Sequence, residues 1–246
     1  MTNILVDERL QGLCVFCGLR IKAKTKTRDH APPKAFLDEP YPVNLQQVGS
    51  CEACNGGASL DEQFVACLLE VAVCGTVDPA GHRRPKIART LADNGALAAY
   101  LRRGLGPEGY RMTEEDGRRL VRVLEKMGRA LWAHQSQEPT GTLAASVGWS
   151  ALEAMTEAQR SAFLSLSTDL YPEVGSRMFI RTVESGANAW MVIQEGRFAY
   201  GVEVLGEVGR IKLIVGDYLA GQIDLMPETE GSWPEQSSWD VDTGEQ

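Results

Sequence analysis

The sequence predicts an α+β protein with a small N-terminal metal module, central helices and a small C-terminal antiparallel β-sheet. Three observations predict it: two Cys-x-x-Cys pairs near the N-terminus, apolar residues at helical spacing through the middle, and short β-rich runs after residue 178. With 246 residues, 43% of them hydrophobic, the chain can bury a core beyond the metal module.

Two pairs of cysteines have the spacing of ligands to one tetrahedral zinc ion. Two residues separate Cys14 from Cys17, and two separate Cys51 from Cys54, so a tight turn can direct both sulfurs of a pair to one metal. The 33 residues between the pairs predict an inserted hairpin or loop. Disulfides are disfavoured and a cytoplasmic location is expected, because the chain begins MTNILVDERL, without a leader segment.

Between the cysteine pairs lies Asp29-His30, followed by Ala-Pro-Pro. The prolines stiffen the chain after the histidine and so fix the direction of its imidazole. A neutral imidazole is a good general base, whereas carboxylate and amide oxygens suit Mg²⁺ or Mn²⁺ better than zinc. His30 is therefore predicted to activate a water, and Asp29 and Asn55 to hold the catalytic ion.

Taken in order, these motifs resemble the HNH endonucleases, which are ββα-metal nucleases that often carry a four-cysteine zinc knuckle. The resemblance covers residues 14–62 and rests on CxxC, DH, NL and CxxCN. It implies that His30 is the general base, that Asp29 and Asn55 bind the catalytic metal, and that Asn44 braces the loop. It also implies cleavage of nucleic acid, DNA before RNA, in restriction or antiviral defence. The lysine that usually follows the last motif is missing here.

The central part reads as a series of helices. A helix over 59–74, ended by Gly75, begins with Ser59 and Glu62 as a capping box, since the preceding Gly-Gly weakens an earlier start. The next helices are expected over 86–103, weakened at Asn94-Gly95, from Thr113 to about His134, and over 156–168. The remaining cysteines are expected in the core, namely Cys67 and Cys74.

From Met178 the pattern changes to β-rich runs, which are MFIRTV, AWMVIQ, RFAYGVEVL, RIKLIVG and QIDLM. Ser185-Gly186 and Glu195-Gly196 are hairpin signals between them. The predicted organisation is a metal module at 1–75, a helical region at 76–170, a β region at 171–228 and an acidic, loosely ordered tail at 229–246.

Charge is unevenly distributed along the chain. Residues 1–129 hold 19 Lys and Arg against 16 Asp and Glu, whereas residues 130–246 hold 6 against 17. The net charge of −8 therefore does not exclude a nucleic-acid partner, which basic residues of the N-terminal half would contact. Alternation in RIKAKTKTR would place its cations on one face of an extended strand. The candidate phosphate contacts are Lys22, Lys24, Lys26, Arg28 and Lys34.

Three readings follow for function. The first is an endonuclease with a structural zinc and a catalytic Mg²⁺ or Mn²⁺. The second is an HNH-like binding module that keeps zinc and cuts nothing. The third is a metal hydrolase acting on a small phosphodiester. No membrane association is expected, and the acidic C-terminal half is a candidate docking surface for a protein partner.

Overall fold

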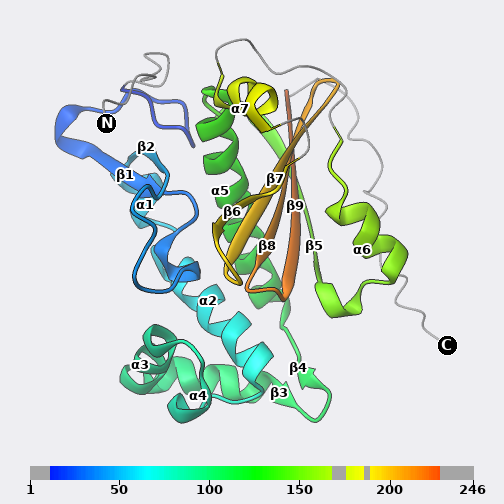
Figure 1. Ribbon diagram of the computed structural model, residues 1–246. Coiled ribbons are helices and arrows are strands. Elements are labelled where there is room, and N and C mark those ends of the chain that lie inside the picture. The colour runs from blue at the N-terminus through cyan, green and yellow to red at the C-terminus, as the bar shows by residue number, and fades with distance from the viewer. Residues whose placement is uncertain (1–11, 168–175, 186–188, 228–246) are drawn as a thin grey trace.

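The computed structural model describes residues 12–167, 176–185 and 189–227 (Figure 1). They form a mixed α+β fold that ends in a five-stranded antiparallel sheet, which confirms the predicted class at that level. The predicted acidic tail lies outside the described residues.

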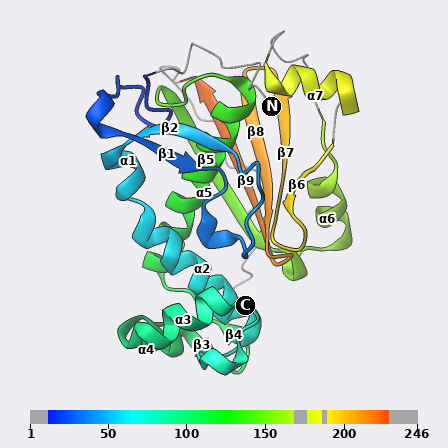
Figure 2. The ribbon, with the colours of Figure 1, turned by 60° about the vertical axis from the view of Figure 1, so that its left-hand side comes forward.

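The N-terminal module is a hairpin followed by a short helix. Strand β1 (Lys26–His30) runs antiparallel to β2 (Gln47–Cys51), and α1 (Glu52–Gly56) begins directly after β2 and packs against β1 (Figure 2). The register places Lys26 opposite Cys51 and His30 opposite Gln47. Two short 3-10 turns flank β1, at Ala23–Thr25 and Lys34–Phe36. The hairpin expected between the cysteine pairs is therefore present.

The central helices largely follow the predicted ranges. They are α2 (Ser59–Cys74), α3 (Pro85–Asp93), α4 (Gly95–Gly104) and α5 (Glu114–Ser136). Helix α2 ends at Gly75, which has the left-handed φ of 65° that glycine adopts without strain. Asn94 breaks the helix between α3 and α4 and caps α4, and Thr113 with Asp116 forms the capping box of α5.

The predicted capping box of α2 is wrong. Ala58 precedes the helix without a side-chain cap, and the Ser59 hydroxyl donates to the Gly56 carbonyl instead. Glu62 turns toward α5, where it accepts a hydrogen bond from Lys126. The Glu62 carboxylate thus forms an ion pair with Lys126 on another helix and does not cap α2.

The sheet has the order β5-β9-β8-β7-β6, and all its neighbours are antiparallel. Its strands are β5 (Leu143–Ala151), β6 (Met191–Gln194), β7 (Phe198–Leu205), β8 (Val208–Val215) and β9 (Leu219–Pro227). Helix α5 packs on one face, and α6 (Glu157–Leu164) with the residues after it covers the other (Figures 1 and 2). The turn at Glu195-Gly196 joins β6 to β7 as predicted.

Two predictions in this region are corrected. MFIRTV is not a strand but part of α7 (Arg177–Ser185), so Ser185 ends a helix rather than opening a hairpin. Ser176 accepts a hydrogen bond from the Phe179 amide, and the helix packs against α5. The helix predicted over 156–168 ends at Leu164. Strand β5 was not foreseen, and it is held by continuous pairing with β9.

Buried apolar side chains connect the metal module to the sheet. One cluster extends from Val15 to Leu225 and includes the buried faces of α2 and α5. Polar bridges cross the same boundary: Gln135 on α5 and Gln46 before β2 both hydrogen-bond to the Tyr200 hydroxyl on β7. The hairpin that carries Asp29-His30 is therefore seated on the rest of the described fold.

Candidate metal and hydrolytic centre

The four predicted zinc ligands come together. Cys14 and Cys17 lie in a tight turn closed by the Gly18 amide donating to the Cys14 carbonyl, while Cys51 ends β2 and Cys54 lies in α1. The four sulfurs lie within 4.8 Å of one another. A tetrahedral zinc site with Zn–S bonds of about 2.3 Å needs sulfurs about 3.8 Å apart. Small side-chain adjustments suffice, so the cluster can hold one structural zinc ion.

The first turn is held in place from both sides. The Val15 amide donates to the Gly49 carbonyl of β2, and the Thr140 amide and hydroxyl both donate to the Val15 carbonyl. Thr140 follows α5, so the cysteine turn is locked between the hairpin and the segment that enters the sheet. A Cβ at Gly141 would lie 2.6 Å from the backbone of Cys17, which leaves room only for glycine there.

Burial and the close approach of the thiols shift the pKa values of Cys14 and Cys54. Burial alone would raise the pKa of Cys14, but backbone hydrogen bonds from Cys51, Cys17 and Phe16 lower it to about 7. Burial and the neighbouring thiols raise the pKa of Cys54. Without a cation one sulfur ionises first and opposes ionisation of the others, a repulsion that zinc relieves.

His30 is the last residue of β1 and is half-buried. Burial and the positive charge of Lys34 lower its pKa, and Asp29 opposes this shift. This lowered pKa favours the neutral imidazole. Its Nε2 lies 3.0 Å from Nε2 of Gln47. The amide nitrogen can only donate, so His30 Nε2 accepts and the ring proton sits on Nδ1.

Asp29 points away from solvent, into the contact between the hairpin and α5. It is 6% exposed, and its Oδ2 lies 2.7 Å from Nζ of Lys126. The same ammonium lies 2.6 Å from Oε1 of Glu62. Burial alone would lower the pKa of Lys126, but hydrogen bonds to both carboxylates raise it. Lys126 thus neutralises Asp29 through Oδ2, and a divalent ion would share the carboxylate with this lysine by binding Oδ1.

The two asparagines come from other segments of the module. Asn44 is exposed in the connection between β1 and β2, and Asn55 is half-buried in α1. Within the described ranges, no hydrogen bond joins either asparagine to Asp29 or His30. Helix α1, which carries Asn55, packs against β1, which carries Asp29. The catalytic Mg²⁺ or Mn²⁺ site at these two residues stays a prediction.

The predicted basic surface is exposed, although it is not one continuous strand. The 3-10 turn at Ala23–Thr25 interrupts the alternation, so only Lys26 and Arg28 lie on β1. Lys34 is exposed, with Nζ 5.0 Å from the centre of the Tyr41 ring. The other predicted phosphate contacts are exposed as well, namely Lys22, Lys24, Lys26 and Arg28.

Three arginines farther along the chain are engaged in ion pairs. Arg84 pairs with Asp38, and Arg119 and Arg122 both pair with Asp61. These pairs join elements to one another, and Arg84 is 5% exposed. They are less available to phosphate than the cations around β1.

The sequence did not identify three groups that shape this region. Lys126 and Glu62 lie on separate helices, so only the folded contact reveals their link to Asp29. No sequence pattern singled out Gln47, which is the first residue of β2. Glu70 and Cys74 are one turn apart on α2, and together with His82 they form a second group of possible metal ligands. Their spacing of four residues was a usable signal.

None of the described helices combines the length and apolar character needed to cross a membrane. In comparisons with family models, curated proteins and solved structures, nothing matched this chain.

Proposed function

We propose that the chain is an HNH-type, metal-dependent endonuclease that hydrolyses phosphodiester bonds of nucleic acid, DNA before RNA. One observation carries the proposal: a half-exposed, neutral histidine ends a hairpin whose second strand and following helix supply two cysteines of a four-thiol cluster. A zinc-fastened hairpin holds its end residue rigidly, as a general base requires. The proposal places the protein in the cytoplasm, in restriction or antiviral defence.

In this proposal His30 takes a proton from the attacking water. Since Nε2 already accepts from Gln47, the base can act only when that amide turns away or gives way to the water. Exposed cations beside the hairpin would hold the phosphate backbone. Among them is Lys34, whose positive charge lowers the pKa of His30. The required Mg²⁺ or Mn²⁺ would stabilise the developing negative charge.

A second candidate function is a zinc-stabilised binding module without cleavage. The contact between Asp29 and Lys126 favours it, because the ammonium already neutralises the carboxylate that the catalytic metal would need and occupies its Oδ2. A module of this kind would still present exposed cations to nucleic acid or its cysteine-held hairpin to a protein.

Supercoiled plasmid incubated with Mg²⁺ or Mn²⁺ separates the two functions. The nuclease predicts nicking by the wild-type chain and its loss in His30→Ala. His134→Gln, a histidine substitution on α5, serves as the matched control and should nick like the wild type. The same samples run without metal test the requirement for a divalent ion.

Equal nicking by the wild type and His30→Ala would contradict the role of His30 and indicate a contaminant. Plasmid that stays intact but shifts in a gel would favour the binding module. Intact plasmid together with turnover of a small phosphodiester would replace nucleic acid by a small substrate.

A further inference from the structure

The C-terminal end of α2 carries three different metal-ligating groups outside the hairpin. Glu70 and Cys74 lie one turn apart on this helix, and His82 comes from the loop before α3. One ligand atom from each lies within 4.8 Å of the others. The three side chains thus converge from two segments onto one point.

The loop holds His82 in a defined position. Asp78 accepts a hydrogen bond from the Ala80 amide, and a Cβ at Gly81 would lie 2.5 Å from the Thr76 side chain. After His82, Arg84 is anchored by its ion pair with Asp38 and by the carbonyls of Ala35 and Leu37. The imidazole is therefore presented between two fixed points of the chain.

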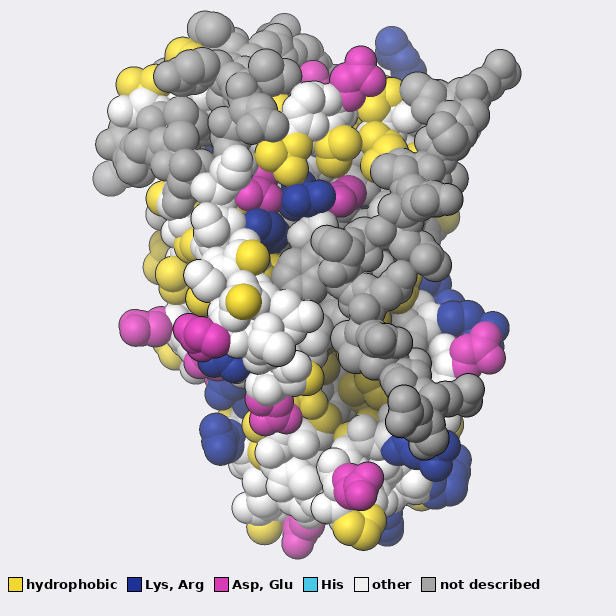
Figure 3. Space-filling model, turned by 90° about the vertical axis from the view of Figure 1, so that its right-hand side faces the viewer, with side chains coloured by type: hydrophobic (Ala, Val, Ile, Leu, Met, Phe, Trp, Pro, Cys, Tyr) yellow, Lys and Arg dark blue, Asp and Glu magenta, His cyan; other side chains and the backbone are white. Residues whose placement is uncertain are grey.

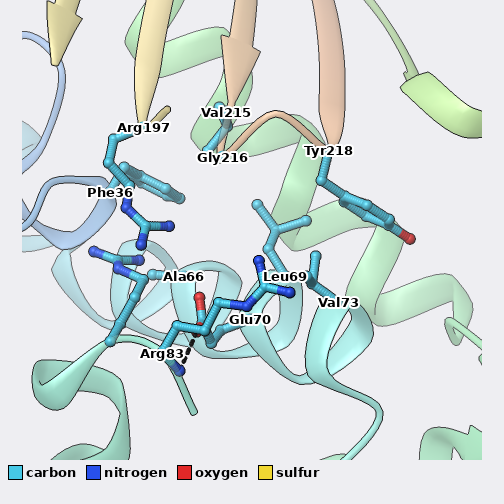
Figure 4. Close-up of a pocket in the computed structure, with 11 residues that line it drawn as sticks. Phe36, Ala66, Leu69, Glu70, Val73, Arg83, Arg197, Val215, Gly216 and Tyr218 are labelled. Atoms are coloured by element: carbon cyan, nitrogen blue, oxygen red, sulfur yellow. Dashed lines mark hydrogen bonds between the residues drawn. The ribbon is translucent and has the colours of Figure 1, made fainter. Parts of the chain in front are cut away.

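The polar atoms at this point lack full partners. Both ring nitrogens of His82 are buried and have no hydrogen-bond partner among the described residues. Glu70 is 7% exposed, and its Oε1 accepts from the Arg83 amide at 3.2 Å (Figure 4). Among the described residues, its other donor is Cys74 Sγ, at 3.6 Å. Buried groups of this kind are costly unless something satisfies them.

We propose that Glu70, Cys74 and His82 bind a second zinc ion, with water as the fourth ligand. Mixed sulfur, nitrogen and oxygen donors suit zinc rather than magnesium. Ligand atoms around a tetrahedral zinc lie about 3.3–3.8 Å apart, and Cys74 Sγ already lies 3.6 Å from Glu70 Oε1. On binding, the Cys74 thiol releases its proton to solvent, and the thiolate and carboxylate balance the 2+ charge.

This zinc would fasten the end of α2 to the loop that leads into α3. It is separate from the four-cysteine cluster, since no residue is shared. The inference also does not depend on the proposed nuclease activity. Glu70 lines a pocket with Arg83 and Arg197, so the site would lie beside a basic cavity (Figure 4).

Zinc content per chain tests the proposal. Full-length protein is incubated with excess zinc, and unbound zinc is removed by gel filtration. The zinc content per chain is then measured by inductively coupled plasma mass spectrometry. The wild type should hold two zinc ions, and His82→Asn and Cys74→Ser should each hold one. Cys67→Ala removes a thiol from the same helix without removing a ligand, so it should still hold two.

Cobalt substitution gives a second readout. The thiolate-to-cobalt absorption of the loaded wild type should lose one component in Cys74→Ser, and its visible bands should change in His82→Asn. A wild type that holds a single zinc would overturn the proposal. So would a folded His82→Asn variant that retains two zinc ions, since this loop substitution leaves the helix intact.

Discussion

Asp61 shows how one carboxylate ties two helices together. It lies near the start of α2, and its two oxygens accept from Arg119 at 2.6 Å and from Arg122 at 3.0 Å, both on α5. Burial alone would raise its pKa, but the hydrogen bonds from these arginines lower it below its usual value of 3.8. Because the folded state favours the ionised form, this contribution to stability is present above pH 4 and is lost as the pH falls through the lowered pKa.

We therefore expect Asp61→Asn to lower the free energy of unfolding by about 1 kcal/mol at pH 7. Urea unfolding between pH 3 and 7 measures this difference from the wild type, which should shrink at the acidic end. A difference that stays constant over that range would show that the carboxylate charge is not its cause.

Cys51 tests the zinc ion of the four-cysteine cluster. Cys51→Ser should remove that zinc and unfold the hairpin, because structural zinc contributes several kcal/mol to the folding of small modules. Metal analysis together with hydrogen exchange of residues 26–51 measures both effects. Cys67→Ala is the control, since it should leave the hairpin amides protected. Protected amides in a zinc-free Cys51→Ser chain would contradict a structural role for the metal.

Sequence spacing predicted the features that depend on short-range geometry. The four cysteines converge as expected because each pair needs only one turn to direct its sulfurs. The environment of Asp29 could not be read in this way, since Lys126 is almost a hundred positions away and meets it only after α5 packs on the hairpin. The same holds for His82, whose partners lie on α2.

At the element scale, helix α5 and the sheet approach each other closely through a glycine. A Cβ at Gly128 would lie 2.7 Å from Ile223 on β9. We expect Gly128→Ala to destabilise the protein by about 1–3 kcal/mol through overpacking. Gly117 lies on the same helix with nothing within 4 Å of its added Cβ, so Gly117→Ala should stabilise the protein by about 0.5–1 kcal/mol. Chemical denaturation of both variants tests this pair, and effects of the same sign would contradict the close approach.

Elements were predictable where their end signals are local. Gly75, Asn94 and the Thr113–Asp116 box each mark a helix end through a backbone interaction within a few residues. Strand β5 has no such signal, because its small residues become a strand only by pairing with β9. The prediction of a strand at α7 was wrong for a different reason. The β-branched residues of this segment favour a strand, and packing against α5 overrides that preference.

At the scale of the whole molecule, charge decides where nucleic acid could bind. On the face shown in Figure 3, acidic and basic side chains are interspersed among the residues that are coloured, and no single-sign patch dominates. In the described part of the chain, exposed cations without an ion pair lie around β1, at Lys24, Lys26 and Arg28, and also on α3 and α4, at Arg89 and Arg102. The N-terminal half is thus the better candidate for contact with phosphates, in keeping with its excess of basic residues.

The proposed phosphate contacts can be tested through their salt dependence. Each lysine or arginine that neutralises a phosphate contributes about one unit to the slope of log K against log salt. Lys24→Ala combined with Arg28→Ala should therefore weaken DNA binding and reduce the slope by about two. The control combines Arg89→Ala on α3 with Arg102→Ala on α4, which removes two exposed charges from the end of the molecule away from β1 (Figure 1). Fluorescence anisotropy with labelled duplex at several salt concentrations measures both pairs. Equal losses in the two pairs would show that binding follows net charge alone, and that the hairpin does not direct it.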